Sequence, residues 1–317
     1  MRVSFVSSSK VKTHRIRNLF LFLLVMSLIA SLAAFSLSAF SIWTLAHPPK
    51  VDVKSFSSNV VPEFSNVTFK DIENKVSLKG WYFEFKGSDK TVLLVHGYGR
   101  NRLQFEEKSL DMIKILLTKG YNVFALDLRN SGESGGDLTS GGALEKADVL
   151  GAIKYVKSKN PKNIVLMGFS TGASACLLAA AESPDVKAVI ADTAIADLSS
   201  YLSESFHLHS HLPQIPFNQT ALLAAKALGK NILSPPAPVE VISALSPRPV
   251  LFIHSEKDSL IPVSHTLRLY KAYSKNAASK AALWITEAPG HMGSFEESPR
   301  YYMDRITEFL DSALKAK

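Results

Sequence analysis

Cysteine is almost absent from this chain of 317 residues, which contains only one. That residue, Cys176, cannot form an intramolecular disulfide, and its alanine-rich surroundings favour a small buried apolar side chain. Internal repeats and low-complexity tracts are lacking too. The composition is therefore that of a globular protein to which one hydrophobic segment has been added.

Charged residues are missing from one long stretch, Leu19 to Ala46. About 20 apolar residues cross the hydrocarbon core of a bilayer as a helix, so this run is long enough to span it. The segment before it carries basic residues and no acidic one: Arg2, Lys10, Lys12, Arg15 and Arg17. This asymmetry predicts a cytoplasmic tail over residues 1–18, a single transmembrane anchor over 19–46, and an extracytoplasmic remainder.

A cleaved signal peptide is the alternative, because it shares the basic start and the apolar middle. Its apolar region is usually about 7 to 15 residues long, and no clear small-residue cleavage site precedes His47. The sequence therefore favours an uncleaved anchor, and Trp43 suits the outer interface of the membrane.

Positive charge is in only small excess outside the tail. The formal net charge is +8, but removing the five basic residues of the tail leaves 31 basic and 28 acidic side chains. A folded part with nearly balanced charge indicates no nucleic-acid partner.

The middle of the chain has the order of an α/β protein. Residues 47–60, with two prolines and several serines, are predicted to be a linker. Segments of alternating polarity at 67–71 and 76–85 are typical of an antiparallel strand pair at a sheet edge. Apolar strands then alternate with helical patterns: strands at 91–96, 122–126, 163–167 and 186–191, and helices at 103–119, 142–158 and 171–182. This order predicts one domain, residues 61–317, with a mostly parallel sheet covered by helices on both faces.

The alternation stops between residues 197 and 246. It resumes with strands at 249–254 and 281–286 and helices at 262–273 and 300–315. Ligands bind at the carboxyl ends of the strands in open parallel sheets. We therefore expect the interruption, which contains short helical pieces, to form a small helical cap over the site.

Ser170 is the candidate nucleophile, in the motif Gly168-Phe169-Ser170-Thr171-Gly172 between an apolar strand and a helix. A serine on such a tight turn exposes its hydroxyl, and the glycines let the strand and the helix approach closely. The hydroxyl needs a base, and the base needs an acid to orient it. Asp258 follows the predicted strand at 249–254 and His291 the one at 281–286, at the same sheet edge and in the chain order Ser, Asp, His.

Other residues compete for the roles of acid and base. Asp192 ends the strand before the cap and also reaches this edge, and Glu256 lies two residues from Asp258. The position of Asp258 in a loop favours it over both. His254 ends a buried strand and His265 begins a helix, so packing or surface roles are preferred for them.

Attack on a carbonyl creates an oxyanion, which needs preorganised hydrogen-bond donors. The backbone N–H of Thr171, directly after the nucleophile, is one candidate. The second is the N–H of Tyr98 in the turn His96-Gly97-Tyr98-Gly99, because the flanking glycines allow this amide to turn toward the site.

These motifs, taken together, resemble the α/β-hydrolase superfamily. They are the 92–99 strand and turn, the 127–134 turn, the Ser170 motif, and the loops with Asp258 and His291. Within the superfamily the chain is similar to bacterial membrane-anchored serine hydrolases, of the serine aminopeptidase-like and acyl-esterase-like groups, over about residues 67–314. The resemblance implies cleavage of a carboxylic ester or other acyl bond through an acyl-enzyme, with no metal or organic cofactor. It also implies structural roles for Asp127 and Arg129.

The motifs leave the substrate class open. The anchor makes a small or lipid-like acyl substrate attractive, whereas a peptidase or an acyltransferase would use the same triad. An aminopeptidase usually needs an acidic group to hold the substrate amine, and the predicted cap offers only Asp197, Glu204 and Glu240. A non-catalytic binding protein predicts a broken triad, but here each member has a candidate.

Three histidines alternate in the predicted cap, His207, His209 and His211, and on a strand they would share one face as metal ligands do. No carboxylate or cysteine accompanies them at a usual zinc spacing. A cap loop that is solvated or lines the pocket is therefore the preferred interpretation.

Overall fold

The computed structural model describes residues 8–57, 59–228 and 236–315. The strands are β1 (Ser65–Lys70), β2 (Ser77–Phe83), β3 (Lys90–Val95), β4 (Asn122–Asp127), β5 (Asn163–Phe169), β6 (Val186–Asp192), β7 (Val250–Lys257) and β8 (Ala281–Pro289). The helices are α1 (Ser8–Ala46), α2 (Lys108–Thr118), α3 (Glu145–Lys157), α4 (Thr171–Glu182), α5 (Leu198–Ser210), α6 (Gln214–Ala227), α7 (Pro238–Val241), the 3-10 turn η1 (Ile242–Leu245), α8 (Ser264–Tyr273), α9 (Gly293–Glu297) and α10 (Pro299–Ala313). Arg2 of the predicted tail and residues 229–235 of the predicted cap lie outside the described residues.

One sheet of eight strands organises the domain, in the order β1-β2-β4-β3-β5-β6-β7-β8. Strand β2 pairs antiparallel with both β1 and β4, and every other pairing is parallel. The mostly parallel sheet with an antiparallel edge is therefore as the sequence predicts. Its parallel arrangement brings the carboxyl ends of β3, β5, β6, β7 and β8 to one edge.

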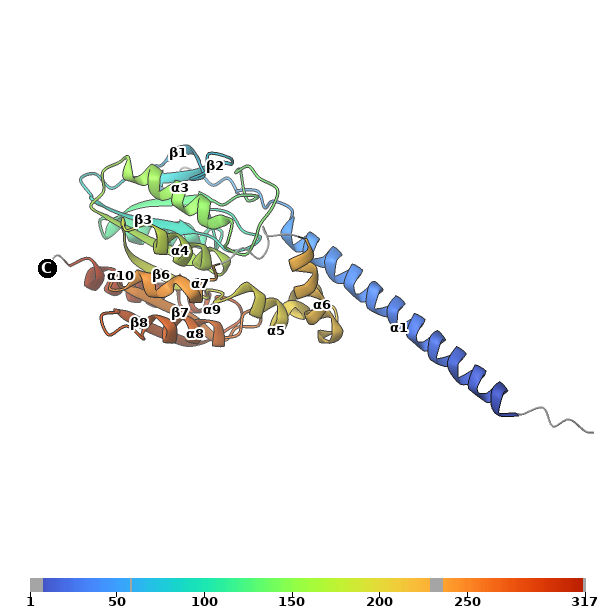
Figure 1. Cartoon of the computed structure of the whole chain (residues 1–317). Coiled ribbons are helices and arrows are strands. Elements are labelled where there is room, and N and C mark those ends of the chain that lie inside the picture. Colours follow the sequence, from blue (N-terminus) through green and yellow to red (C-terminus); the bar gives the residue numbers. More distant parts are fainter. Residues whose placement is uncertain (1–7, 58, 229–235, 316–317) are drawn as a thin grey trace, which may run out of the picture.

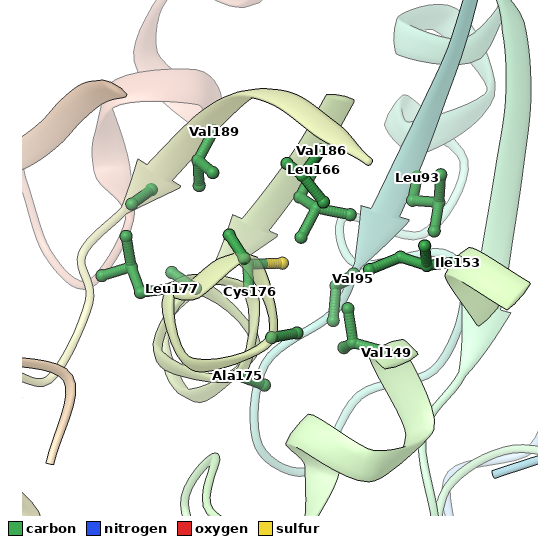
Figure 2. Close-up of a cluster of buried hydrophobic side chains, with 14 of the residues drawn as sticks. Leu93, Val95, Val149, Ile153, Leu166, Ala175, Cys176, Leu177, Val186 and Val189 are labelled. Carbon is green, nitrogen blue, oxygen red and sulfur yellow. The ribbon is translucent and has the colours of Figure 1, made fainter. Parts of the chain in front are cut away.

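Apolar side chains fill both faces of the sheet because successive residues of a buried strand point to opposite sides. Leu93 and Val95 pack with helices α3 and α4 on one face, whereas Val92 and Leu94 pack with α2 on the other. Figure 2 shows Cys176 of α4 within the first of these layers. It is fully buried, and burial raises the pKa of its thiol, so it is a packing residue as expected.

The turn after β4 is held by buried ion pairs. Asp127 accepts a hydrogen bond from the backbone N–H of Arg102 at 2.7 Å, and the two side chains also form an ion pair. Arg129 pairs with Asp148 of α3 at 2.7 Å. These contacts join the sheet to its neighbouring loops and helix, and neither Asp127 nor Arg129 lines the main cavity described below.

Helix α1 extends away from the domain, α6 lies beside its carboxyl-terminal part, and α5 adjoins α6 (Figure 1). The segment His14–Ala46 is long and apolar enough to cross a membrane. Where α1 meets α6, the hydroxyl groups of Ser38 and Thr220 are 2.7 Å apart. Helices α5, α6 and α7 follow β6 and precede β7, so the insertion in the sheet is helical.

The segment 47–60, predicted to be a linker, lies against the domain. Asn130 donates to the carbonyl of Pro48 at 3.2 Å, and Asn101 donates to the carbonyl of Asp52 at 3.0 Å. Just before this segment, the carbonyl of Ala46 accepts from the N–H of Thr139 at 2.8 Å. The end of α1 is therefore tied to the domain by backbone contacts as well as by packing.

Candidate active site

Ser170 stands on a strained turn between β5 and α4, with φ +52° and ψ −122°. A Cβ atom at Gly168 would lie 2.6 Å from the Cα atom of Ala173, and one at Gly172 would lie 2.2 Å from the carbonyl oxygen of His96. Both glycines are therefore required for the close approach of strand and helix. The turn places the serine at the carboxyl edge of the sheet, next to the end of β3.

The structure brings the three predicted triad residues together. The Nε2 atom of His291 is 3.1 Å from Ser170 Oγ, and its Nδ1 atom is 2.8 Å from Asp258 Oδ2. Because the carboxylate can only accept, Nδ1 carries the hydrogen, and Nε2 is left to accept the hydrogen of the serine hydroxyl. This is the arrangement that nucleophilic catalysis by serine needs.

Asp258 is held in its charged form. Burial of its side chain raises the pKa of the carboxyl, but the hydrogen bond and charge of His291 act against burial. The backbone N–H groups of Leu260 and Ile261 also donate to Oδ1, at 2.8 and 2.9 Å. The balance leaves the pKa of Asp258 below its usual value, so the carboxylate is available to orient the histidine.

The loops that carry Asp258 and His291 are adjacent because β7 and β8 continue together beyond the rest of the sheet. Lys257 pairs with Pro289 after a register shift, and the N–H of Gly290 donates to the carbonyl of Lys257 at 3.2 Å. The sequence analysis ended both strands three residues too early. Their last residues are largely polar, so apolar periodicity does not reveal this extension.

The competing acids are placed differently. Both oxygens of Asp192 accept hydrogen bonds from other side chains, one from Tyr302 at 2.8 Å and the other from Thr193 at 2.9 Å. Glu256 is exposed to solvent. Within the described part of the chain, only Asp258 makes a carboxylate hydrogen bond to His291.

Asp192 gives the folded protein a specific pH dependence. Burial raises the pKa of its carboxyl from 3.8 to about 6, although Tyr302 and Thr193 partly oppose this. Between about pH 4 and pH 6 the folded protein therefore keeps a proton on Asp192 that the unfolded chain has released. The contribution of this group to the free energy of unfolding is complete below about pH 4 and is lost as the pH rises through 6. Asp192→Asn cannot ionise, so its advantage over the wild type in free energy of unfolding should grow by about 2 kcal/mol between pH 4.5 and pH 7.5.

Urea denaturation of the detergent-solubilised full chain at the two pH values would measure this difference. If the variant and the wild type differ in free energy of unfolding by the same amount at pH 4.5 and at pH 7.5, Asp192 ionises normally in the fold.

His254 and His265 are buried packing residues, as the sequence suggests. His254 lies 2.7 Å from the hydroxyl of Thr266 through Nδ1 and 2.9 Å from the carbonyl of Ile261 through Nε2. His265 Nδ1 accepts from the N–H of Ala196 at 3.2 Å. Neither histidine lines the main cavity.

The two predicted oxyanion donors border the same cavity as Ser170. Tyr98 and Thr171 both line it, and neither of their N–H groups donates to a protein acceptor within the described ranges. Gln104, which the sequence analysis did not single out, accepts the N–H of Gly97 at 2.6 Å and so fixes the turn that carries Tyr98.

The main cavity has a volume of about 370 Å³ and contains Ser170 and His291 in its lining. Apolar residues of α1 and α5 form much of its wall, whereas Arg100 and Glu296 are exposed polar residues at its border. This size lies within the usual range for small-molecule sites. Glu296 comes from α9, a short helix that the sequence analysis missed.

The cap histidines lie on a helix and not on a strand. His207 and His209 belong to α5, and His211 is its C-cap residue. Residues two apart are about 200° apart around a helix, so His209 faces away from the other two. It lines the main cavity and hydrogen-bonds the hydroxyl of Tyr201, and burial lowers its pKa. No group of three metal-ligating side chains occurs among the described residues.

Comparisons with known proteins place this chain in a family. The model of the prolyl oligopeptidase family matches residues 108–317, more than half of the chain. The chain belongs to that family. The uncharacterized protein YqkD of Bacillus subtilis, 33% identical over 239 residues, matches 74% of this chain and 75% of its own length.

Solved structures agree with the family match. The Pyrococcus furiosus esterase Pf2001 has a TM-score of 0.70 and 26% sequence identity, and the alignment covers 84% of this chain and 98% of the esterase. The acylaminoacyl peptidase of Pyrococcus horikoshii has a TM-score of 0.61 and 22% identity, over 83% of this chain and 44% of the peptidase, and shows the shared fold. These findings confirm the predicted α/β-hydrolase fold of this prolyl oligopeptidase family member and support an enzyme of the serine hydrolase type.

Proposed function

We propose that this protein is a membrane-anchored serine esterase that cleaves carboxylic esters through an acyl-enzyme. The observation that carries the proposal is the hydrogen-bonded series Ser170, His291, Asp258 at a largely apolar cavity. Ser170 Oγ bonds to the substrate carbonyl carbon as His291 takes its proton. The amides of Tyr98 and Thr171 hold the oxyanion.

The same residues complete the cycle. The bond between the carbonyl carbon and the oxygen of the alcohol breaks, and His291 returns the proton to the departing alcohol. Water, deprotonated by His291, then attacks the acyl-enzyme and releases the acid and free Ser170. No cofactor takes part in this scheme.

The acidic residues of the region favour an ester over a peptide with a free amino terminus. Asp197 caps α5 by accepting from two backbone N–H groups, and Glu240 borders a separate smaller pocket. The side chain of Glu204 is half-exposed and lies near His265. Glu296, exposed to solvent, is the one carboxylate that lines the main cavity in the described ranges. A buried acid aimed at a substrate amine is therefore not part of this cavity.

The proposed topology has the basic tail in the cytoplasm, α1 across the membrane and the catalytic domain outside. It is supported by the length and apolarity of His14–Ala46 and by the basic residues before the apolar run. Lys10, Lys12, Arg15 and Arg17 precede the apolar run that begins at Leu19, and no acidic residue balances them.

Labelling of spheroplasts of an expressing bacterium with fluorophosphonate probes tests both parts of the proposal. A membrane-impermeant probe should modify Ser170 on intact spheroplasts, and peptide mapping identifies the residue. Labelling by a permeant probe alone would place the catalytic domain in the cytoplasm. An absence of labelling by either probe, with the protein folded and present, would reject Ser170 as the nucleophile. Release of p-nitrophenol from esters but of no product from aminoacyl amides would separate an esterase from a peptidase.

A further inference from the structure

The last part of α1 is built into the domain. Its buried residues recur at every fourth position, Ala34, Ser38, Ile42 and Ala46, and so form one stripe along the helix. This stripe faces the cap helices, where Ile42 packs in a cluster with α5 and α6 residues: Leu202, Phe206, Ala221 and Ala225. Residues 14–33 of α1, in contrast, are exposed.

The same end of α1 lines the cavity that contains the nucleophile. Ile42, Leu45 and Ala46 border it from α1, and Leu202 and Phe206 border it from α5. These five apolar side chains give the cavity an uncharged section of wall, which we call the acyl compartment, and Ser170 lines the same cavity. Such a compartment suits an aliphatic chain, since each buried methylene adds to binding by leaving water.

The length of α1 accounts for this second role. At 1.5 Å per residue, about 20 residues cross a hydrocarbon core of about 30 Å. Counted from Asn18, directly after the last basic residue, such a span ends at Leu37. Residues 38–46 then remain outside the hydrocarbon, and they include Ile42 and Leu45, which pack on the cap, and the α1 residues that border the cavity.

We propose that residues 42–46 of α1 form a wall of the acyl-binding site, so that the substrates are esters with an aliphatic acyl chain well beyond acetyl in length. The proposal rests on the esterase function given above. It makes α1 a part of the substrate site as well as an anchor. Cleavage of a signal peptide after Ala46 would remove this wall, so the active protein retains α1.

The test uses the full chain in detergent micelles and p-nitrophenyl esters of two, four, eight and twelve carbons. Each methylene buried in the compartment is expected to raise kcat/KM by up to about fourfold, which corresponds to 0.8 kcal/mol. For the wild type, octanoate should therefore exceed acetate in kcat/KM by at least about tenfold.

Two changes at Leu45 should move this preference in opposite directions. Leu45→Trp fills the compartment and should lower the octanoate-to-acetate ratio at least about tenfold, whereas Leu45→Ala enlarges it and should shift the best substrate toward dodecanoate. General damage to the fold cannot produce opposite shifts. Phe40→Trp, on an exposed face of the same helix, is the matched control and should keep the wild-type profile.

The outcomes separate this inference from the proposed function. Ester hydrolysis that needs Ser170, together with unchanged chain-length profiles in both Leu45 variants, overturns the role of α1 and leaves the esterase standing. A wild type that hydrolyses acetate better than any longer ester overturns it too. If the wild type cleaves no ester at all, the proposed function fails and the inference fails with it.

Discussion

Replacing Ser170 by alanine should lower kcat for p-nitrophenyl butyrate by about 10⁶-fold, the size of effect found when a triad nucleophile is removed. The hydroxyl is the group that forms the acyl-enzyme, and among the described residues it is the side-chain group hydrogen-bonded to His291 Nε2, at 3.1 Å. The oxyanion amides remain, so a small residual rate above the uncatalysed one is expected. Initial rates of p-nitrophenol release at matched protein concentration measure the loss.

The control for this variant is Ser174→Ala. Ser174 lies one turn further along α4, where its hydroxyl bonds the backbone of Ile195, and it does not line the main cavity. It should keep an activity close to that of the wild type. Circular dichroism of both variants should match the wild type, because each substitution removes only one hydroxyl group. Full activity in the Ser170 variant would end the assignment of this residue as nucleophile.

The positions of Ser170 and His291 could be predicted because local sequence carries the relevant geometry. The glycines at 168 and 172 reveal a turn in which strand and helix nearly touch, and the structure shows contacts that a Cβ atom would violate. The strand and helix periodicities place both residues at one sheet edge. The parallel topology then brings the carboxyl ends of these strands to one edge of the sheet, independently of the conformations of the loops.

The choice between Asp258 and Asp192 depends on partners that are distant in the sequence. Both residues end or follow a strand at the catalytic edge. What separates them is Tyr302 of α10, which binds Asp192, and the register-shifted pairing of β7 with β8, which brings Asp258 to His291. Neither contact leaves a periodic signal, so sequence reasoning could favour Asp258 only by its loop position.

The involvement of α1 in the cavity could not be read from the sequence for a different reason. A helix that is apolar on all sides shows no amphipathic face, so the packed stripe of Ala34, Ser38 and Ile42 looks like its exposed neighbours. The one available signal was length, because a charge-free run of 28 residues exceeds what a bilayer needs. The sequence analysis assigned the whole run to the membrane anchor, whereas in the structure its last residues pack against the cap.

Asp258→Asn should lower kcat by about 10⁴-fold with little change in the fold. The amide group of asparagine can donate to Nδ1 of His291, which favours the tautomer with the hydrogen on Nε2. That nitrogen then faces Ser170 as a donor and cannot take the proton of the hydroxyl. The carboxylate also stabilises the positively charged imidazole that forms during attack, and the neutral amide does not. Rates of p-nitrophenol release at pH 8 measure the loss.

Asp192→Asn is the matched control, since it makes the same chemical change at the other acid of this sheet edge. Its side chain contacts Tyr302 and Thr193, so we expect its kcat to stay within a few-fold of the wild type. A reversed result, with a large loss in the Asp192 variant and a small one in the Asp258 variant, would assign the acid to β6. Equal large losses of kcat would mean that catalysis by His291 depends on both carboxylates. Only the predicted difference between the variants supports the hydrogen bond of 2.8 Å between Asp258 and His291 as the catalytic one.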